Sequence, residues 1–165
     1  MTLARPEPLR PDHDLSDFSC GHATLDEWLR RRALANQKAG ASRIYVVTND
    51  RGQKVVAYYA IASGALAVRD ATAKLRRNMP DPIPMAILGR LAIDQNFQQQ
   101  GLGRALFRDA AVRIMRAADE VGIRGLMVHA ISDEAAAFYQ ALGLQAAPDE
   151  PRLFMITLQE LRAAM

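Results

Sequence analysis

The sequence has few cysteines, glycines and prolines and no long apolar run, and each scarcity excludes a class of protein. Among 165 residues, Cys20 is the single cysteine, so no internal disulfide forms, and no Cys/His cluster has metal-ligand spacing. Eight prolines and ten glycines are too few for a low-complexity chain. The longest apolar stretch, 55–68, is interrupted at Ser63 and Gly64 and is shorter than the roughly 20 residues of a membrane span. We therefore expect a protein of the reducing cytoplasm with no membrane segment and no metal.

The composition that is present predicts one globular domain over residues 1–165. Half of the residues are hydrophobic, and the length is sufficient to bury a core. The net charge of +3 is unevenly distributed, because residues 1–90 carry 14 Lys/Arg against 9 Asp/Glu and residues 91–165 carry 7 against 9. Basic clusters occur at Arg30, Arg31, Arg32, Lys38 and Arg43, and at Lys74, Arg76 and Arg77. Such clusters fit either a polyanionic partner or a solvated face.

The order of helical and strand patterns predicts an α/β fold. A helix is expected over 24–38, opened by Thr24 as N-cap and stopped at Gly40. Strands are expected at 44–48, 55–66, 85–93, 126–131 and 153–157, and further helices at 72–78, 103–121, 133–142 and the C-terminus. This alternation indicates a mixed sheet with crossover helices.

The segment between the strand 85–93 and the helix 103–121 is the most informative part of the chain. Gly101 and Gly103 allow the backbone to turn its N–H groups inward, and the helix N-terminus adds positive potential at the same point. A pyrophosphate cradle and an ordinary strand-to-helix turn both fit. The glycines match neither the dinucleotide G-x-G-x-x-G motif nor a P-loop.

Gln98-x-x-Gly101-x-Gly103 resembles the Q/R-x-x-G-x-G/A motif of the GNAT superfamily of acetyl-coenzyme A N-acetyltransferases. The resemblance implies acetyl-CoA as cosubstrate and a central mixed β-sheet, splayed between strands 4 and 5 and flanked by helices. It also implies that backbone groups of the loop bind the coenzyme pyrophosphate and that Arg104 adds its charge. The residues of this loop are Gln98, Gln99, Gln100, Gly101, Leu102, Gly103 and Arg104. Main-chain groups of Leu91, Ala92 and Ile93 would pair with the pantetheine arm and polarise the acetyl carbonyl.

A second segment, 129–144, resembles the GNAT strand-to-helix region that ends in F-Y-x-x-x-G-F. Tyr139 stands at the position of the general acid, which protonates the departing coenzyme A thiolate. A phenol has a reference pKa near 10 and is protonated at neutral pH. Phe138 is assigned to the cofactor with Ser132, which stands where many members have an asparagine that contacts the pantetheine. A core role for Tyr139 is the alternative, because it shares a helical stripe with Ala135 and Leu142.

No general base is evident in the sequence. Asp94 and Glu134 lie near the motifs but have no recognisable partner. His129 is expected to be a core or interface histidine within a strand. Cys20 precedes the motifs and has no histidine partner in view, so a cysteine nucleophile is not expected.

Nearly the whole chain resembles the GNAT toxins of bacterial type II toxin–antitoxin modules, the TacT group. The resemblance rests on Phe18-Ser19-Cys20-Gly21, Leu25-Asp26-x-Trp28-Leu29, Asn36-Gln37-x-x-Gly40-x-Ser42-Arg43, Val56-Ala57-Tyr58-Tyr59 and Leu88-Gly89-Arg90-Leu91-Ala92-Ile93-Asp94. It implies transfer of acetyl to the α-amino group of aminoacyl-tRNA, which blocks translation, and neutralisation by a ribbon-helix-helix antitoxin. Family members commonly form homodimers.

The tRNA-binding residues expected on this basis are Arg30, Arg31, Lys38, Arg77 and Arg90, with a surface salt bridge as the alternative for Arg77 and Arg90. Two other functions remain open. One is N-acetylation of a small amine or a protein N-terminus, and the other is coenzyme A binding in a regulatory module without turnover. Only the tRNA reaction should weaken steeply with salt.

Overall fold

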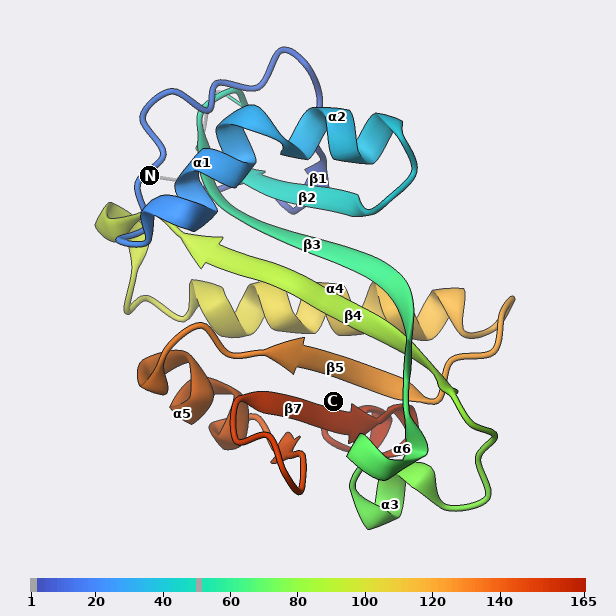
Figure 1. Cartoon of the computed structure of the whole chain (residues 1–165). Helices are drawn as coiled ribbons and strands as arrows, with labels where there is room; N and C mark the ends of the chain where they lie inside the picture. Colours follow the sequence, from blue (N-terminus) through green and yellow to red (C-terminus); the bar gives the residue numbers. More distant parts are fainter. Residues whose placement is uncertain (1–2, 50–51) are drawn as a thin grey trace. The chain divides into compact units, whose positions relative to one another are not determined.

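The computed structural model describes residues 3–49 and 52–165 (Figure 1). Its strands form one mixed sheet with the order β1-β2-β3-β4-β5-β7-β6. The strands are β1 (Glu7–Pro8), β2 (Arg43–Thr48), β3 (Val55–Leu66), β4 (Ile83–Ile93), β5 (Gly125–His129), β6 (Gln145–Ala146) and β7 (Leu153–Thr157). The helices are α1 (Ala23–Arg31), α2 (Ala33–Lys38), α3 (Ala73–Arg76), α4 (Leu102–Ala117), α5 (Asp133–Ala141) and α6 (Leu158–Ala163), with 3-10 turns η1 (Val68–Asp70) and η2 (Gln95–Phe97).

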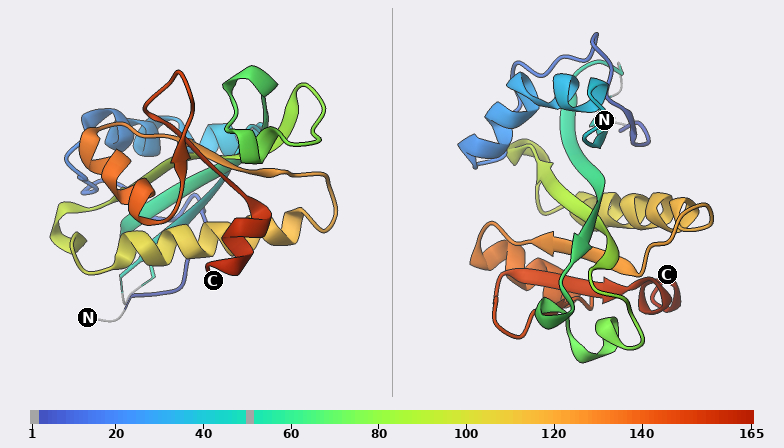
Figure 2. Two further views of the ribbon diagram at one scale, coloured as in Figure 1. Left: turned by 90° about the horizontal axis from the view of Figure 1, so that it is seen from below. Right: turned by 45° about the vertical axis from the view of Figure 1, so that its right-hand side comes forward.

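The chain forms two compact units, of which the first comprises the described residues up to Ala62 together with Arg90–Ala110. In this unit β1, β2 and β3 pair in antiparallel order, with Tyr45 opposite Tyr59. The helices α1 and α2 lie together beside β2 in Figures 1 and 2. Their apolar side chains, led by Leu29 and Ala33, share a core with those of the strands. Burial of this apolar face stabilises both short helices, which are below the length that is stable alone in water.

The second unit comprises Ser63–Gly89 and Ala111–Met165. Met85 to Ile87 of β4 pair in parallel with Gly125 to Met127 of β5, and β5 pairs in antiparallel order with β7. Gly125 is required for this pairing, because a Cβ atom there would lie 2.3 Å from the carbonyl oxygen of Ile156. Buried methionine and leucine side chains fill the core beneath α3.

The structure confirms the α/β class with a mixed sheet and places a strand in each expected region. It also differs from expectation in detail. The helix expected over 24–38 is two helices, because Arg32 leaves helical geometry at φ −120°. Thr24 is not its N-cap: His22 holds that position without a side-chain bond. The helix expected over 103–121 begins at Leu102 and ends at Ala117. The two-residue strands β1 and β6 were not expected, since elements so short carry no periodicity.

Within residues 3–49 and 52–165, every helix is too short or too polar to cross a membrane. The same residues include no group of three or more His, Cys, Asp or Glu side chains placed to hold a metal ion.

Candidate active site

The loop between β4 and α4 turns through two residues with left-handed backbone geometry. Gln99 has φ +61° and Gly101 has φ +81°, and α4 begins at the next residue, Leu102. A non-glycine residue in this region is uncommon and is often found at functional sites. The first N–H groups of α4 have no acceptor within the helix. The loop from Gln98 to Gly101 is exposed, so solvent reaches this turn at the positive end of the α4 dipole, a position that favours negative charge.

The side chain of Gln98 is hydrogen-bonded to two backbone carbonyl groups beside this loop. Its Nε2 donates hydrogen bonds to the carbonyl oxygens of Cys20, at 2.9 Å, and Ile93, at 2.8 Å. The motif had assigned Gln98 only a backbone contact with the pyrophosphate. A clue was present in the sequence, because the motif accepts glutamine or arginine, and both carry several N–H donors.

Asp94, which follows β4 directly, is buried and bonded to two backbone amides. Its Oδ1 accepts from Asn96 N at 3.0 Å and caps η2, and its Oδ2 accepts from Ser19 N at 3.1 Å. The sequence offered no partner for this carboxylate, and the structure supplies both. Ala92 is buried in the core, while Leu91 and Ile93 are half-buried.

Tyr139 lies on α5 in an aromatic environment. Only 5% of the residue is exposed, and its ring lies 5.2 Å from that of Phe138 and 6.5 Å from that of Phe154. Burial raises the pKa of the phenol above its usual value, so the hydroxyl is protonated at physiological pH. Ser132 is the N-cap of α5, and its Oγ accepts from Ala135 N at 3.1 Å. The shorter serine therefore orders the start of the helix that carries Tyr139.

An acetyltransferase (GNAT) domain model matches residues 40–145 of this chain. The chain belongs to the GNAT acetyltransferase family. A protein of Mycobacterium tuberculosis named a tRNA-acetylating toxin is 44% identical over 158 residues, which are 96% of this chain and 94% of that protein.

Solved structures agree with this membership. AtaT complexed with acetyl-methionyl-tRNAfMet is 27% identical, with a TM-score of 0.89 and 98% of each chain covered. A tyrosine-to-phenylalanine variant of AtaT, bound to the C-terminus of the antitoxin AtaR and to acetyl-CoA, is 27% identical with a TM-score of 0.82; the match covers 98% of this chain and 96% of that one. The expected GNAT fold is thereby confirmed.

Two of the arginines predicted to bind tRNA have specific partners within the first unit. The guanidinium of Arg90, on β4, lies 3.9 Å from the centroid of the Trp28 ring, and Trp28 in turn stacks on Tyr58. The indole covers one face of the Arg90 guanidinium in a cation–π contact. From the sequence, a phosphate contact or a surface salt bridge was expected for this residue. Arg30 Nη1 donates to the carbonyl oxygen of Phe18 at 2.7 Å, so this residue already has a structural contact.

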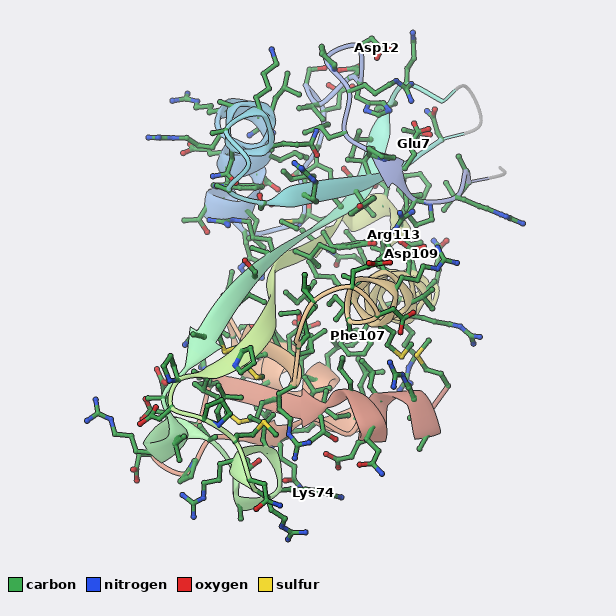
Figure 3. All side chains as sticks on the ribbon, turned by 90° about the vertical axis from the view of Figure 1, so that its right-hand side faces the viewer. Glu7, Asp12, Lys74, Phe107, Asp109 and Arg113 are labelled. Carbon is green, nitrogen blue, oxygen red and sulfur yellow. The ribbon has the colours of Figure 1, made fainter. Side chains whose placement is uncertain are left out.

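The other basic candidates are exposed. Arg31 and Lys38 lie on α1 and α2 of the first unit, and Arg77 is the C-cap of α3 in the second. Lys74, labelled in Figure 3, pairs with Glu160 at 3.2 Å, which neutralises part of the cluster that contains Arg77.

Of the two roles expected for His129, core or interface, the core role was wrong. His129 is the last residue of β5, its side chain is 67% exposed, and its Nε2 lies 3.5 Å from Glu150 Oε1. The strand was expected to continue to Ile131, which would have placed the histidine well inside it, whereas the strand ends at His129.

Cys20 is buried, and burial raises the pKa of its thiol to about 12, with the Asp26 carboxylate acting in the same direction. The thiol is therefore protonated at neutral pH, as expected for a cysteine that does not act as a nucleophile.

Proposed function

We propose that this chain is a toxin that transfers the acetyl group of acetyl-CoA to the α-amino group of aminoacyl-tRNA and so blocks peptide-bond formation. The observation that carries the proposal is the sequence similarity to the tRNA-acetylating toxin over nearly the full length of both chains. Proteins that share only the GNAT fold do not need such similarity. Residues 1–165 would act as one acetyltransferase domain in the cytoplasm, where aminoacyl-tRNA is found.

Acetyl-CoA would bind along β4 and the loop that follows it. The main-chain groups of Leu91, Ala92 and Ile93 would pair with the pantetheine arm, with Ser132 and Phe138 also contacting the cofactor. The exposed turn before α4 would hold the pyrophosphate through its amides, with residues Gln98, Gln99, Gln100, Gly101, Leu102, Gly103 and Arg104. The left-handed residues Gln99 and Gly101 support this assignment, because left-handed residues are a feature of backbone turns that bind anions through their N–H groups.

In the reaction, the neutral α-amino nitrogen attacks the thioester carbonyl, the carbon–sulfur bond breaks, and the coenzyme leaves as a thiolate. We assign Tyr139 as the general acid that protonates this thiolate. Burial keeps the phenol in its acid form at neutral pH, so a proton is in place when the thiolate forms. The nitrogen releases its own proton to solvent, and solvent returns a proton to the Tyr139 phenolate before the next turnover. A free α-amino group has a pKa near 8, and the ester linkage to tRNA should lower it, which raises the neutral fraction of the acceptor without a protein base.

The tRNA backbone would contact Arg30, Arg31 and Lys38 on the first two helices, together with Arg77 and Arg90. Stacking on Trp28 supports the role of Arg90, because it fixes the guanidinium plane while the N–H edge can still donate to a phosphate. Arg30 would bind phosphate with donors other than the one bonded to Phe18.

We further propose that a ribbon-helix-helix antitoxin neutralises the enzyme and that the chain forms a homodimer. The antitoxin-bound structure of the related AtaT supports a separate inhibitory partner. The ribbon-helix-helix class and the dimer follow from the resemblance to TacT-type toxins.

The test is transfer of labelled acetyl from acetyl-CoA to a pool of aminoacylated tRNA. Deacylated tRNA, small amines and peptides with free N-termini are compared at the same enzyme concentration, at low and high salt. The proposal predicts label on charged tRNA alone and a rate that falls steeply with salt. Efficient labelling of a small amine or peptide, with none on charged tRNA, would overturn it.

A further inference from the structure

The short segment Phe18–Cys20 is hydrogen-bonded to the turn that leads into the candidate pyrophosphate loop. Ser19 N donates to Asp94 Oδ2 at 3.1 Å, and the Ser19 carbonyl accepts from Gln95 N at 2.8 Å. The Cys20 carbonyl accepts from Gln98 Nε2 at 2.9 Å. Three successive bonds thus join the segment to residues 94–98, all within the first compact unit.

The same segment is bonded on its other side to α1. Cys20 N donates to Asp26 Oδ1 at 2.9 Å, and Arg30 Nη1 donates to the Phe18 carbonyl at 2.7 Å. Asp26 is buried, and its bond is charge-assisted, which makes it stronger than a neutral one. Phe18 and Cys20 are themselves buried in the core with Leu29. The segment is therefore fixed to a helix before it reaches the loop.

We propose that Phe18–Cys20, here named the strap, holds the loop 94–103 in its coenzyme-binding form, with Gln98 and Asp26 as positioning residues. Asp26 would act on acetyl-CoA through the strap, and Gln98 through the loop itself. The inference rests on the acetyl-CoA chemistry of the GNAT family and does not depend on tRNA as the acceptor.

The donor inventory of Gln98 supports positioning over direct binding by its side chain. A glutamine amide has two N–H hydrogens, and its Nε2 has two carbonyl acceptors, at Cys20 and Ile93. The remaining polar atom, Oε1, is an acceptor and cannot donate to a phosphate. The side chain therefore joins the strap to the end of β4, immediately before the left-handed residues Gln99 and Gly101. Loss of both bonds should release the loop without removing any ligand to the coenzyme.

The experiment compares Gln98→Met, which keeps the length but removes both donors, with Gln98→Arg, which restores N–H donors. The exposed Gln159 on α6 provides the matched control, Gln159→Met. Calorimetry measures the Kd of acetyl-CoA, and steady-state kinetics separate KM for acetyl-CoA from kcat. Two lost hydrogen bonds predict a Kd and KM raised roughly tenfold for Gln98→Met. We expect an unchanged kcat at saturating acetyl-CoA, recovery in Gln98→Arg and no change in Gln159→Met.

A second variant tests the connection to α1. Asp26→Asn keeps an acceptor for Cys20 N but loses the charge, so it should raise the Kd of acetyl-CoA by a few fold. Because the Gln98 bond to the Cys20 carbonyl links the strap to the loop, the effects of Asp26→Asn and Gln98→Met should combine to less than their product. Any of three results would overturn the proposal. Gln98→Met could bind acetyl-CoA with wild-type affinity, or Gln98→Met and Gln98→Arg could lose affinity equally. The third is a double variant whose Kd rises by the full product of the two single effects. Melting temperatures identify any variant that has lost its fold.

Binding of acetyl-CoA is measured without an acceptor, so the two proposals fail separately. An enzyme with the predicted affinities but no acetylation of charged tRNA would refute the proposed function and leave the strap intact. If the enzyme acetylates charged tRNA but Gln98→Met binds acetyl-CoA with unchanged affinity, the strap proposal is refuted and the proposed function stands.

Discussion

Tyr58 and Tyr59 are adjacent on β3, and the structure predicts different losses of stability when their hydroxyls are removed. Both side chains are fully buried. The Tyr59 hydroxyl donates to Asp109 Oδ2 on α4, whereas the Tyr58 hydroxyl donates to the carbonyl oxygen of Leu25 at 2.8 Å. Figure 3 shows Asp109 and Phe107 on different sides of α4. The Tyr59 bond thus ties the strand to the helix whose N-terminus forms the candidate pyrophosphate site.

Replacement of Tyr59 by phenylalanine removes a bond to a charged acceptor, and such bonds contribute roughly 1.5–3 kcal/mol. We expect Tyr59→Phe to lower the free energy of unfolding by about 2 kcal/mol. For a chain of this length the melting temperature should fall by roughly 4–8 °C. Tyr58→Phe removes a neutral bond and should cost about 1 kcal/mol.

Urea unfolding is the assay, followed by the fluorescence of Trp28, the single tryptophan, which lies in the first unit. A double-mutant cycle with Asp109→Asn isolates the Tyr59–Asp109 coupling, which should exceed about 1 kcal/mol. The reasoning is refuted if Tyr59→Phe costs no more than Tyr58→Phe, or if the cycle is additive.

Three further predictions concern charge and protonation. Arg90→Met should reduce the slope of log K for tRNA binding against log salt by about 1, in binding titrations from low to high salt; an unchanged slope would exclude a phosphate contact. Cys20, with a thiol pKa of about 12, should resist iodoacetamide at pH 8 in the native protein, and rapid alkylation followed by mass spectrometry would contradict its burial. The acetylation rate should rise with pH as the acceptor amine loses its proton, without a decline from Tyr139 below about pH 10. The protonated phenol is the active form, and a raised pKa moves its loss to higher pH. A tyrosinate absorbance step below that pH, absent in Tyr139→Phe, would count against this assignment.

The elements that a local pattern specifies were predictable from the sequence. The glycines at 101 and 103 lie where a strand gives way to a long helix, and the structure has that turn. A helix was expected from residue 133, and the hydroxyl of the preceding Ser132 accepts the bond from Ala135 N that caps it. In both cases the physical cause lies within a few residues of the feature.

Features that depend on distant residues were not predictable. Thr24 and Glu27 have the spacing of a capping box, but the helix starts one residue before Thr24, and Asp26 binds Cys20 N outside the helix. The bond from Gln98 to Cys20 spans 78 positions, and that from Ser19 to Asp94 spans 75. No sequence period connects such residues. Arg30 likewise read as one member of a basic run, although its guanidinium is bonded to the Phe18 carbonyl.

The most direct test of the proposed reaction locates the transferred acetyl group on the product. Charged tRNA is incubated with acetyl-CoA and enzyme and digested with ribonuclease, and the terminal aminoacyl-adenosine is analysed by mass spectrometry. We predict one acetyl group on the α-amino nitrogen with the wild-type enzyme and a large loss of product with Tyr139→Phe. An unmodified terminal aminoacyl-adenosine, from enzyme shown to bind acetyl-CoA, would contradict the proposed function. Undiminished acetylation by Tyr139→Phe would contradict the assignment of the general acid.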